Sequence, residues 1–116
     1  MSLPLFVYGS LRDAAVRARV LGGRRGAPPI ATEPAMLRGY VWQMAPGFGY
    51  PFVTPGAADD AVDGEILHGL AADDYARLDR YEDTDSGLYV RVRVSVETAH
   101  GPAEAWTYCK GPNAPA

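Results

Sequence analysis

The sequence has little cysteine, little histidine and no long hydrophobic run. Its 116 residues contain one cysteine, Cys109, which excludes a disulfide framework and a thiolate metal cluster. The two histidines, His68 and His100, lie far apart and lack partners at metal-ligand spacing, so we expect no metal site. No apolar run approaches the roughly 20 residues of a membrane-spanning helix, and no basic stretch precedes an apolar core at the N-terminus. We therefore expect a cytoplasmic protein that makes no membrane contact.

The length and composition are typical of a soluble globular protein. With 47% hydrophobic and 22% charged residues, the chain is long enough for one core, so we expect a single domain over residues 1–116. The net charge of -3 is unevenly spread, because residues 1–40 are rich in Arg and residues 41–86 are rich in acids. This asymmetry indicates either a small anion held near the N-terminal part or ordinary solvated surfaces. The acidic balance and the lack of a nucleic-acid-binding motif argue against a nucleic-acid partner.

Hydrophobic periodicity predicts about six strands and two helices. The predicted strands are residues 5–8, 36–44, 50–54, 62–70, 88–96 and 103–109, and the predicted helices are residues 11–21 and 73–82. Residues 22–34 read as an irregular loop, a turn is expected at 45–47, and residues 111–116 are expected to fray. This order favours an α+β fold in which a small mixed β-barrel or sheet carries two flanking helices.

Glu82 is the most informative residue for chemistry. In a helix over residues 73–82 it shares one face with Tyr75 and Leu78, so its carboxylate points toward the core. A desolvated carboxylate finds a partner, stays partly wet in a cleft or takes up a proton. Burial and the end of the helix each favour a raised pKa, as a general base requires. The alternative is that Glu82 caps a neighbouring segment or pairs with an Arg such as Arg91.

Two further groups of residues are candidates for the same site. The turn Tyr8-Gly9-Ser10-Leu11 joins a buried strand to a helix start, where free backbone N–H groups can bind an anion. In the strand at residues 88–96, Val90, Val92, Val94 and Val96 are predicted to share one face. Tyr89 and Arg91 lie on the opposite face, where they either orient Glu82 and line a pocket or form a solvent-facing ladder. Asp79 is a rival base, although its place beside Leu78 turns it toward solvent.

Several strings of the sequence resemble motifs of the gamma-glutamylcyclotransferase-like superfamily. They are FVYGSLR at residues 6–12, GYP at 49–51, VDGEIL at 62–67, LDRYE at 78–82, LYVR at 88–91 and WTY at 106–108. The resemblance implies a small β-barrel with flanking helices that holds a gamma-glutamyl group. It also implies that the substrate carboxylate rests on the backbone amides of Tyr8, Gly9, Ser10 and Leu11, and that Glu82 is the catalytic acid/base. Tyr89 and Arg91 are then expected among the substrate-binding residues.

The resemblance implies an intramolecular aminolysis that releases 5-oxoproline and a free amine and needs no cofactor. The expected partner is a small gamma-glutamyl substrate, whose leaving amine stays open, as does the oligomeric state. Family members often carry Gly after the catalytic Glu, whereas this chain has Asp83 and an acidic loop over residues 83–87. A second buried carboxylate would raise the pKa of Glu82 further, and an exposed one would only solvate the loop. A module that binds a carboxylate metabolite without turnover is the alternative function, and a scaffold without ligand is a third.

Overall fold

The structure, a computed structural model, describes residues 3–22, 24, 26–44 and 51–114. Its elements in chain order are β1 (Leu5–Val7), the 3-10 turn η1 (Ser10–Arg12), α1 (Ala14–Leu21), β2 (Ala31–Arg38), β3 (Tyr40–Met44), β4 (Pro51–Pro55), β5 (Ala61–His68), α2 (Ala72–Tyr81), β6 (Tyr89–Thr98) and β7 (Gly101–Lys110). The described part of the chain thus holds seven strands, one more than the sequence predicts. The turn predicted at residues 45–47, and Tyr50 of the strand predicted at 50–54, lie outside the described residues.

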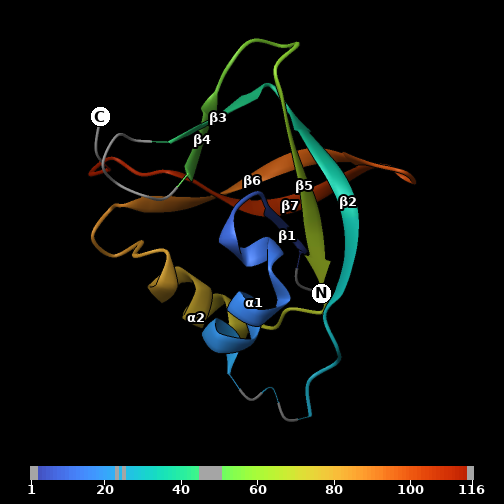
Figure 1. The fold of residues 1–116 in the computed structure, drawn as a ribbon, viewed down its shortest axis with the longest axis vertical. Helices are drawn as coiled ribbons and strands as arrows, with labels where there is room; N and C mark the ends of the chain where they lie inside the picture. The colour runs from blue at the N-terminus through green and yellow to red at the C-terminus, as the bar shows by residue number, and fades with distance from the viewer. Residues whose placement is uncertain (1–2, 23, 25, 45–50, 115–116) are drawn as a thin grey trace.

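Five strands close into a mixed barrel in the order β1-β5-β2-β6-β7. All pairs are antiparallel except β1 with β7, where Leu5 and Trp106 are parallel partners. Strands β3 and β4 form a separate two-stranded sheet. Figure 1 shows α1 and α2 side by side beneath the barrel, with β3 and β4 above it. The predicted α+β fold, a small mixed barrel with two flanking helices, is confirmed.

Alternation along β1 divides the core into two parts. Leu5 and Val7 pack with Leu67 and Leu78 in a cluster between the barrel and the helices. Phe6 points the other way, into a cluster that holds the barrel side chains Leu37, Ile66, Val96 and Cys109 together with Val53 of β4. The candidate site lies at the end of β1, next to the end of α2.

Strand β1 lies very close to β5 because Gly64 has no side chain. A Cβ at Gly64 would lie 2.3 Å from the Val7 carbonyl oxygen and 2.6 Å from the Phe6 ring. Both are far inside ordinary contact distance, and the first neighbour is backbone that cannot move alone. The glycine of the VDGEIL string is therefore required by packing at the strand that leads into the site.

Buried ion pairing fixes the start of α2. Asp74, which is buried, accepts hydrogen bonds from Arg24 Nη2 at 2.7 Å and from the Ala71 N–H at 2.8 Å. The hydrogen bond from Arg24 lowers the pKa of Asp74, although burial opposes it. Arg24 also donates to the carbonyls of Pro28 and Gly69. The segment before β2 is thus tied to the helix that carries Glu82.

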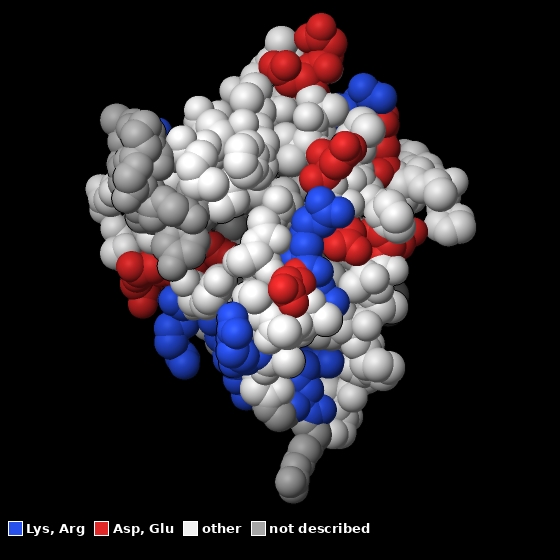
Figure 2. Space-filling view, in the orientation of Figure 1, with Lys and Arg blue, Asp and Glu red and all other residues white. Residues whose placement is uncertain are grey.

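The uneven charge of the sequence is partly compensated by ion pairs between residues 1–40 and residues 41–86. Arg12 pairs with Glu65 at 3.3 Å, and Arg24 pairs with Asp74, so two N-terminal arginines meet acids of residues 41–86. In the view of Figure 2, Lys and Arg side chains gather over the lower half of the molecule, where α1 and α2 lie, and most acidic side chains lie above them. No helix of the described residues is long and apolar enough to cross a membrane.

Two sequence predictions about chain segments are wrong. The irregular loop predicted for residues 22–34 is too long, because β2 already begins at Ala31. Pro34 is tolerated there since β2 pairs with β6 only from Ala35 onward, so its missing N–H breaks no second ladder. The fraying predicted for residues 111–116 is wrong for 111–114: the N–H of Gly111 donates to Leu88 O, and Asn113 donates to Gly87 O and Ser86 O.

The valine face predicted for β6 contacts the barrel core at Val92, Val94 and Val96 but not at Val90. Val94 and Val96 are buried inside the barrel, whereas Val90 is 40% exposed and Tyr89, on the opposite face, is buried. The reason is a change of neighbours, because the described first half of β6 pairs only with β7 and turns its other face toward β4 and α2. The face that carries Tyr89 and Arg91 is therefore not a solvent-facing ladder.

Candidate functional site

A cavity of about 220 Å³ lies between the end of β1, the end of α2 and strands β6 and β7. The residues that line it are Phe6, Val7, Tyr8, Gly9, Ser10, Leu11, Pro51, Tyr81, Glu82, Asp83, Leu88, Tyr89 and Tyr108. The cavity therefore brings Glu82 together with the turn at residues 8–11, which lies more than 70 positions earlier in the sequence. Tyr89 also lines it, as the sequence indicates.

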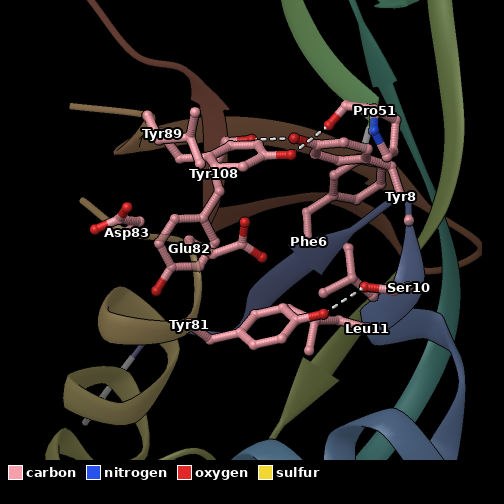
Figure 3. A pocket seen from close by; sticks show the side chains of 13 residues that line it. Phe6, Tyr8, Ser10, Leu11, Pro51, Tyr81, Glu82, Asp83, Tyr89 and Tyr108 are labelled. Carbon is pink, nitrogen blue, oxygen red and sulfur yellow. Dashed lines mark hydrogen bonds between the residues drawn. The ribbon is translucent and has the colours of Figure 1, made fainter. Parts of the chain in front are cut away.

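Glu82 is the C-cap of α2. The helix ends at Tyr81, one residue earlier than the predicted helix over residues 73–82, so Glu82 follows the helix instead of forming its last residue. Its N–H donates to the Leu78 carbonyl at 2.9 Å, and the chain then leaves the helix through Asp83, whose φ is 55°. This left-handed conformation suits glycine, which explains physically why a glycine at this position is favourable. Figure 3 shows the Glu82 carboxylate directed into the cavity, with Tyr8, Tyr89 and Tyr108 on one side and Tyr81 and Ser10 on the other.

The Glu82 side chain is half-buried, and its carboxylate forms no hydrogen bond or ion pair with a described residue. Burial raises its pKa from 4.5 to about 7, because the charged form loses solvation that no neighbour replaces. Asp83 is exposed, so the alternative in which a second buried carboxylate acts on Glu82 does not apply. A carboxyl that is half ionised near neutral pH can both accept and donate a proton.

The turn after β1 offers backbone donors to the same cavity. Residues 10–12 form η1, in which Gly9 O and Ser10 O accept the N–H groups of Arg12 and Asp13 at 3.0 Å. The N–H groups that open such a turn have no acceptor within it, and no side chain caps η1. The Ser10 hydroxyl is 3.0 Å from the Tyr81 hydroxyl, so it bridges to the end of α2. The helical segment α1 begins after η1, where Asp13 caps the Ala15 N–H.

Tyrosine hydroxyls fix the walls of the cavity. Tyr8 donates to the Tyr108 carbonyl, and Tyr89 donates to the Pro51 carbonyl at 2.7 Å. Tyr108 donates to Asp79 Oδ1 at 2.6 Å. Burial is the largest cause of the raised pKa of both Tyr8 and Tyr108, so these hydroxyls stay neutral donors. The acidic side chains among the described residues that line the cavity are Glu82 and Asp83.

Arg91 does not line this cavity. Its guanidinium pairs with Asp79, with Nε 3.1 Å from Oδ1, so the alternative in which Arg91 pairs with Glu82 is wrong. Asp79 does not simply face solvent as predicted, because Arg91 and Tyr108 both contact its carboxylate. Asp79 and Arg91 line a second hollow beside the first, and Tyr89 belongs to both.

Sequence reasoning missed Tyr81, Tyr108 and Pro51 as lining residues. Tyr81 and Tyr108 stand within the LDRYE and WTY strings, so their positions were marked but their place in the cavity was not. Sequence separation also hid a contact of the two histidines, since His68 and His100 approach the Glu33 carboxylate at 2.9 Å and 3.9 Å. Within the described ranges, no group of three or more His, Cys, Asp or Glu residues is arranged to hold a metal ion.

Together, the fold and the site define a small mixed-barrel protein in which a half-buried carboxylate, Glu82, shares a cavity with the turn at residues 8–11. The family model described as gamma-glutamyl cyclotransferase, AIG2-like matches residues 5–116, and the chain belongs to this family. No curated protein matches the sequence significantly.

Solved structures agree with this assignment. A protein of Arabidopsis thaliana known from its solution structure is 28% identical, with a TM-score of 0.76, over 97% of this chain and 70% of that one. A second Arabidopsis thaliana protein is 29% identical, with a TM-score of 0.72, over 95% of this chain and 62% of that one, so the chain spans less than two thirds of its length. An AIG2-like protein of Mus musculus is 21% identical, with a TM-score of 0.76, over 97% of this chain and 80% of that one, and it supports the fold alone.

Proposed function

We propose that the protein is an enzyme that cyclises gamma-glutamyl amines or peptides. The α-amine of the substrate attacks its own γ-carbonyl carbon, a five-membered ring closes, and the γ-amide C–N bond breaks. The products are 5-oxoproline and a free amine, and the attacking nitrogen loses the proton that the leaving nitrogen gains. The nucleophile and electrophile belong to one molecule, so the protein has to fold the substrate and move protons, which requires no cofactor.

Glu82 is the proposed general acid/base. Its carboxylate takes a proton from the α-ammonium group and later delivers one to the leaving nitrogen, and both steps favour a pKa near neutrality. The single observation that carries the proposal is the Glu82 carboxylate itself, which is directed into a cavity, lacks a partner among the described residues, and has its pKa raised by burial to about 7. An unpaired acid in such a place costs stability, which makes a purely structural role a poor explanation.

The turn at Tyr8, Gly9, Ser10 and Leu11 is the proposed substrate-binding element. Its backbone amides hold the α-carboxylate of the substrate, and Tyr89 contributes a wall of the cavity. Free amides at the start of a turn are suited to an anion, and they stand across the cavity from Glu82. Arg91, predicted from the sequence to bind substrate, lies outside the cavity and is given a different role below.

The direct test is formation of 5-oxoproline from a panel of gamma-glutamyl amines and gamma-glutamyl amino acids, followed by mass spectrometry. We expect Glu82→Gln to keep the fold and to lose turnover by roughly two to four orders of magnitude. Asp85→Asn is the matched control, because it neutralises an exposed carboxylate three positions away. Turnover of purified Glu82→Gln at the level of Asp85→Asn would refute the proposal.

The same panel separates catalysis from binding alone. The cavity and the amide turn would serve a non-catalytic carboxylate-binding module equally well, and only Glu82 distinguishes the two functions. Calorimetric binding of a gamma-glutamyl compound without product would assign the protein to the binding module. If no compound binds and none gives a product, the result would support a scaffold without ligand.

A further inference from the structure

Three polar side chains join the end of α2 to the barrel at the edge of the cavity, and one of them, Tyr108, also lines it. Asp79 of α2 accepts a hydrogen bond from Tyr108 of β7 at 2.6 Å and contacts Arg91 of β6 through both oxygens, at 3.1 Å and 3.4 Å. Arg91 and Tyr108 are partners in the β6–β7 register, so they meet Asp79 from adjacent strands. We call Asp79, Arg91 and Tyr108 the anchor cluster.

Aromatic rings fix the guanidinium of Arg91. Its Cζ atom is 4.7 Å from the centroid of the Tyr75 ring and 4.7 Å from that of Trp106. The Tyr75 hydroxyl in turn donates to the Leu3 carbonyl at 2.7 Å. The planar cation thus contacts α2 through Tyr75 as well as through Asp79, and it contacts β7 through Trp106.

The anchor cluster lies on both sides of Glu82. Asp79 stands three residues before Glu82, and its carbonyl accepts the N–H and the hydroxyl of Thr84, which closes the turn that contains Glu82. On the barrel side, the carbonyl of Tyr108 holds the hydroxyl of Tyr8, which faces Glu82 across the cavity. A displacement of Asp79 or Tyr108 would therefore change the distance between Glu82 and the residues opposite it.

Neither Asp79 nor Arg91 is placed to touch a substrate in the Glu82 cavity. Both line the neighbouring hollow, and each is already matched by an opposite charge. The titratable groups that face Glu82 in its own cavity are different ones, namely Asp83 and the tyrosines 8, 81, 89 and 108. Asp79 and Arg91 can therefore influence chemistry only through the position of other groups.

We infer that the anchor cluster is a positioning device that fixes the last turn of α2 against β6 and β7 and so holds the Glu82 carboxylate at the reacting atoms. This inference rests on the proposed function and assigns residues that support its general base. Misplacement of a catalytic group by about 1 Å can cost roughly 100-fold in rate. The anchor cluster is thus expected to affect the chemical step more than substrate binding.

The test compares Arg91→Met and Asp79→Asn with the matched control Arg93→Met. Arg93 lies two residues further along β6 and pairs with Glu104 at 3.6 Å on the exposed surface, so its loss removes an ion pair of the same strand without touching α2. Two quantities are measured, namely kcat and KM for 5-oxoproline formation and the NMR titration of the Glu82 side chain in protein labelled with 13C-glutamate. The Glu82 signal is identified by its absence from Glu82→Gln.

We expect Arg91→Met and Asp79→Asn to lower kcat by about 10- to 100-fold while KM changes much less. The titration midpoint of Glu82 should fall from about 7 toward 4.5, because a loosened turn admits water to the carboxyl. Arg91→Lys keeps the charge but not the planar contacts with both rings, so it should recover part of kcat. The double variant should lose no more kcat than the more impaired of the two single variants, since the two residues act as one unit.

The inference is overturned if Arg91→Met and Asp79→Asn match Arg93→Met in kcat and in the Glu82 titration. Should Arg91→Met fail to fold by circular dichroism, Arg91→Lys and Asp79→Asn decide, and wild-type values in both would overturn it. If the wild-type protein forms no 5-oxoproline, the proposed function fails. The titration of Glu82 then still tests the anchor cluster, because an unchanged midpoint contradicts the positioning role and a lowered one supports it.

Discussion

Replacement of Glu82 by Gln should make the protein more stable at alkaline pH. Burial raises the pKa of Glu82 from 4.5 to about 7 in the folded protein, whereas the unfolded chain keeps the ordinary value. Between these two pH values the folded state holds a proton that the unfolded state has released. The free energy of unfolding of the wild-type protein therefore falls as the pH rises through this window, and the whole loss is present above pH 7.

The size of this effect follows from the raised pKa. At about 1.4 kcal/mol per pKa unit, the difference between 4.5 and about 7 corresponds to about 3 kcal/mol. This value is an upper limit, because the carboxylate opens onto a cavity rather than into a closed core. Glutamine resembles the protonated acid in shape and charge, so Glu82→Gln should gain about 1–3 kcal/mol at pH 8 and little near pH 5.

Urea unfolding at pH 5, 6, 7 and 8, followed by tryptophan fluorescence, measures this gain. The control is Asp85→Asn, which removes an exposed carboxylate of the neighbouring loop and should show no such dependence on pH. Equal free energies of unfolding for wild type and Glu82→Gln at pH 8 would refute the reasoning. A gain in stability that is larger at pH 5 than at pH 8 would also refute the reasoning, because this pH dependence requires a carboxylate whose ionised form is stabilised by a partner.

Two further predictions concern the rate and the barrel. The value of kcat/KM should fall about tenfold for each pH unit below about 7, because only ionised Glu82 accepts the ammonium proton; an acid limb centred near 4.5 would contradict the raised pKa. Gly64→Ala should lower the free energy of unfolding by about 1–3 kcal/mol or more, since its methyl group would lie 2.3 Å from Val7 O. Urea unfolding against the exposed control Ser95→Ala measures this loss, and unchanged stability would show that the strands can separate at no cost.

Local periodicity was sufficient to predict most elements and the direction of the key side chain. Tyr75 and Leu78 are buried on one face of α2, and Glu82 follows them toward the cavity, because a period of 3.6 residues depends only on neighbours along the chain. The turn at residues 8–11 was predictable for the same reason, since the glycine that breaks the strand is adjacent to it in the sequence.

Partners supplied by distant segments could not be predicted in this way. The exposure of Val90 and the burial of Tyr89 at the start of β6 depend on which strand or helix lies beside that part of the strand, and nothing within residues 88–96 records those neighbours. The pairing of Arg91 with Asp79 depends likewise on how α2 docks on the barrel. The bonds of Gly111 and Asn113 to the loop after α2 contradict a composition that is typical of a frayed end, because three backbone or amide donors find acceptors there.

The motif strings of the sequence combine residues that serve different physical purposes. Whether a charged residue has an oppositely charged partner distinguishes these purposes. Four half-buried side chains in these strings carry formal charges, namely Glu65, Asp79, Glu82 and Arg91. Glu65 pairs with Arg12, and Asp79 pairs with Arg91, so the charge of each is compensated. Glu82 alone among the four has no such partner within the described chain. A compensated charge can be explained by structure and an uncompensated one cannot, and this difference is why the proposed reacting group is Glu82 and not Glu65, Asp79 or Arg91.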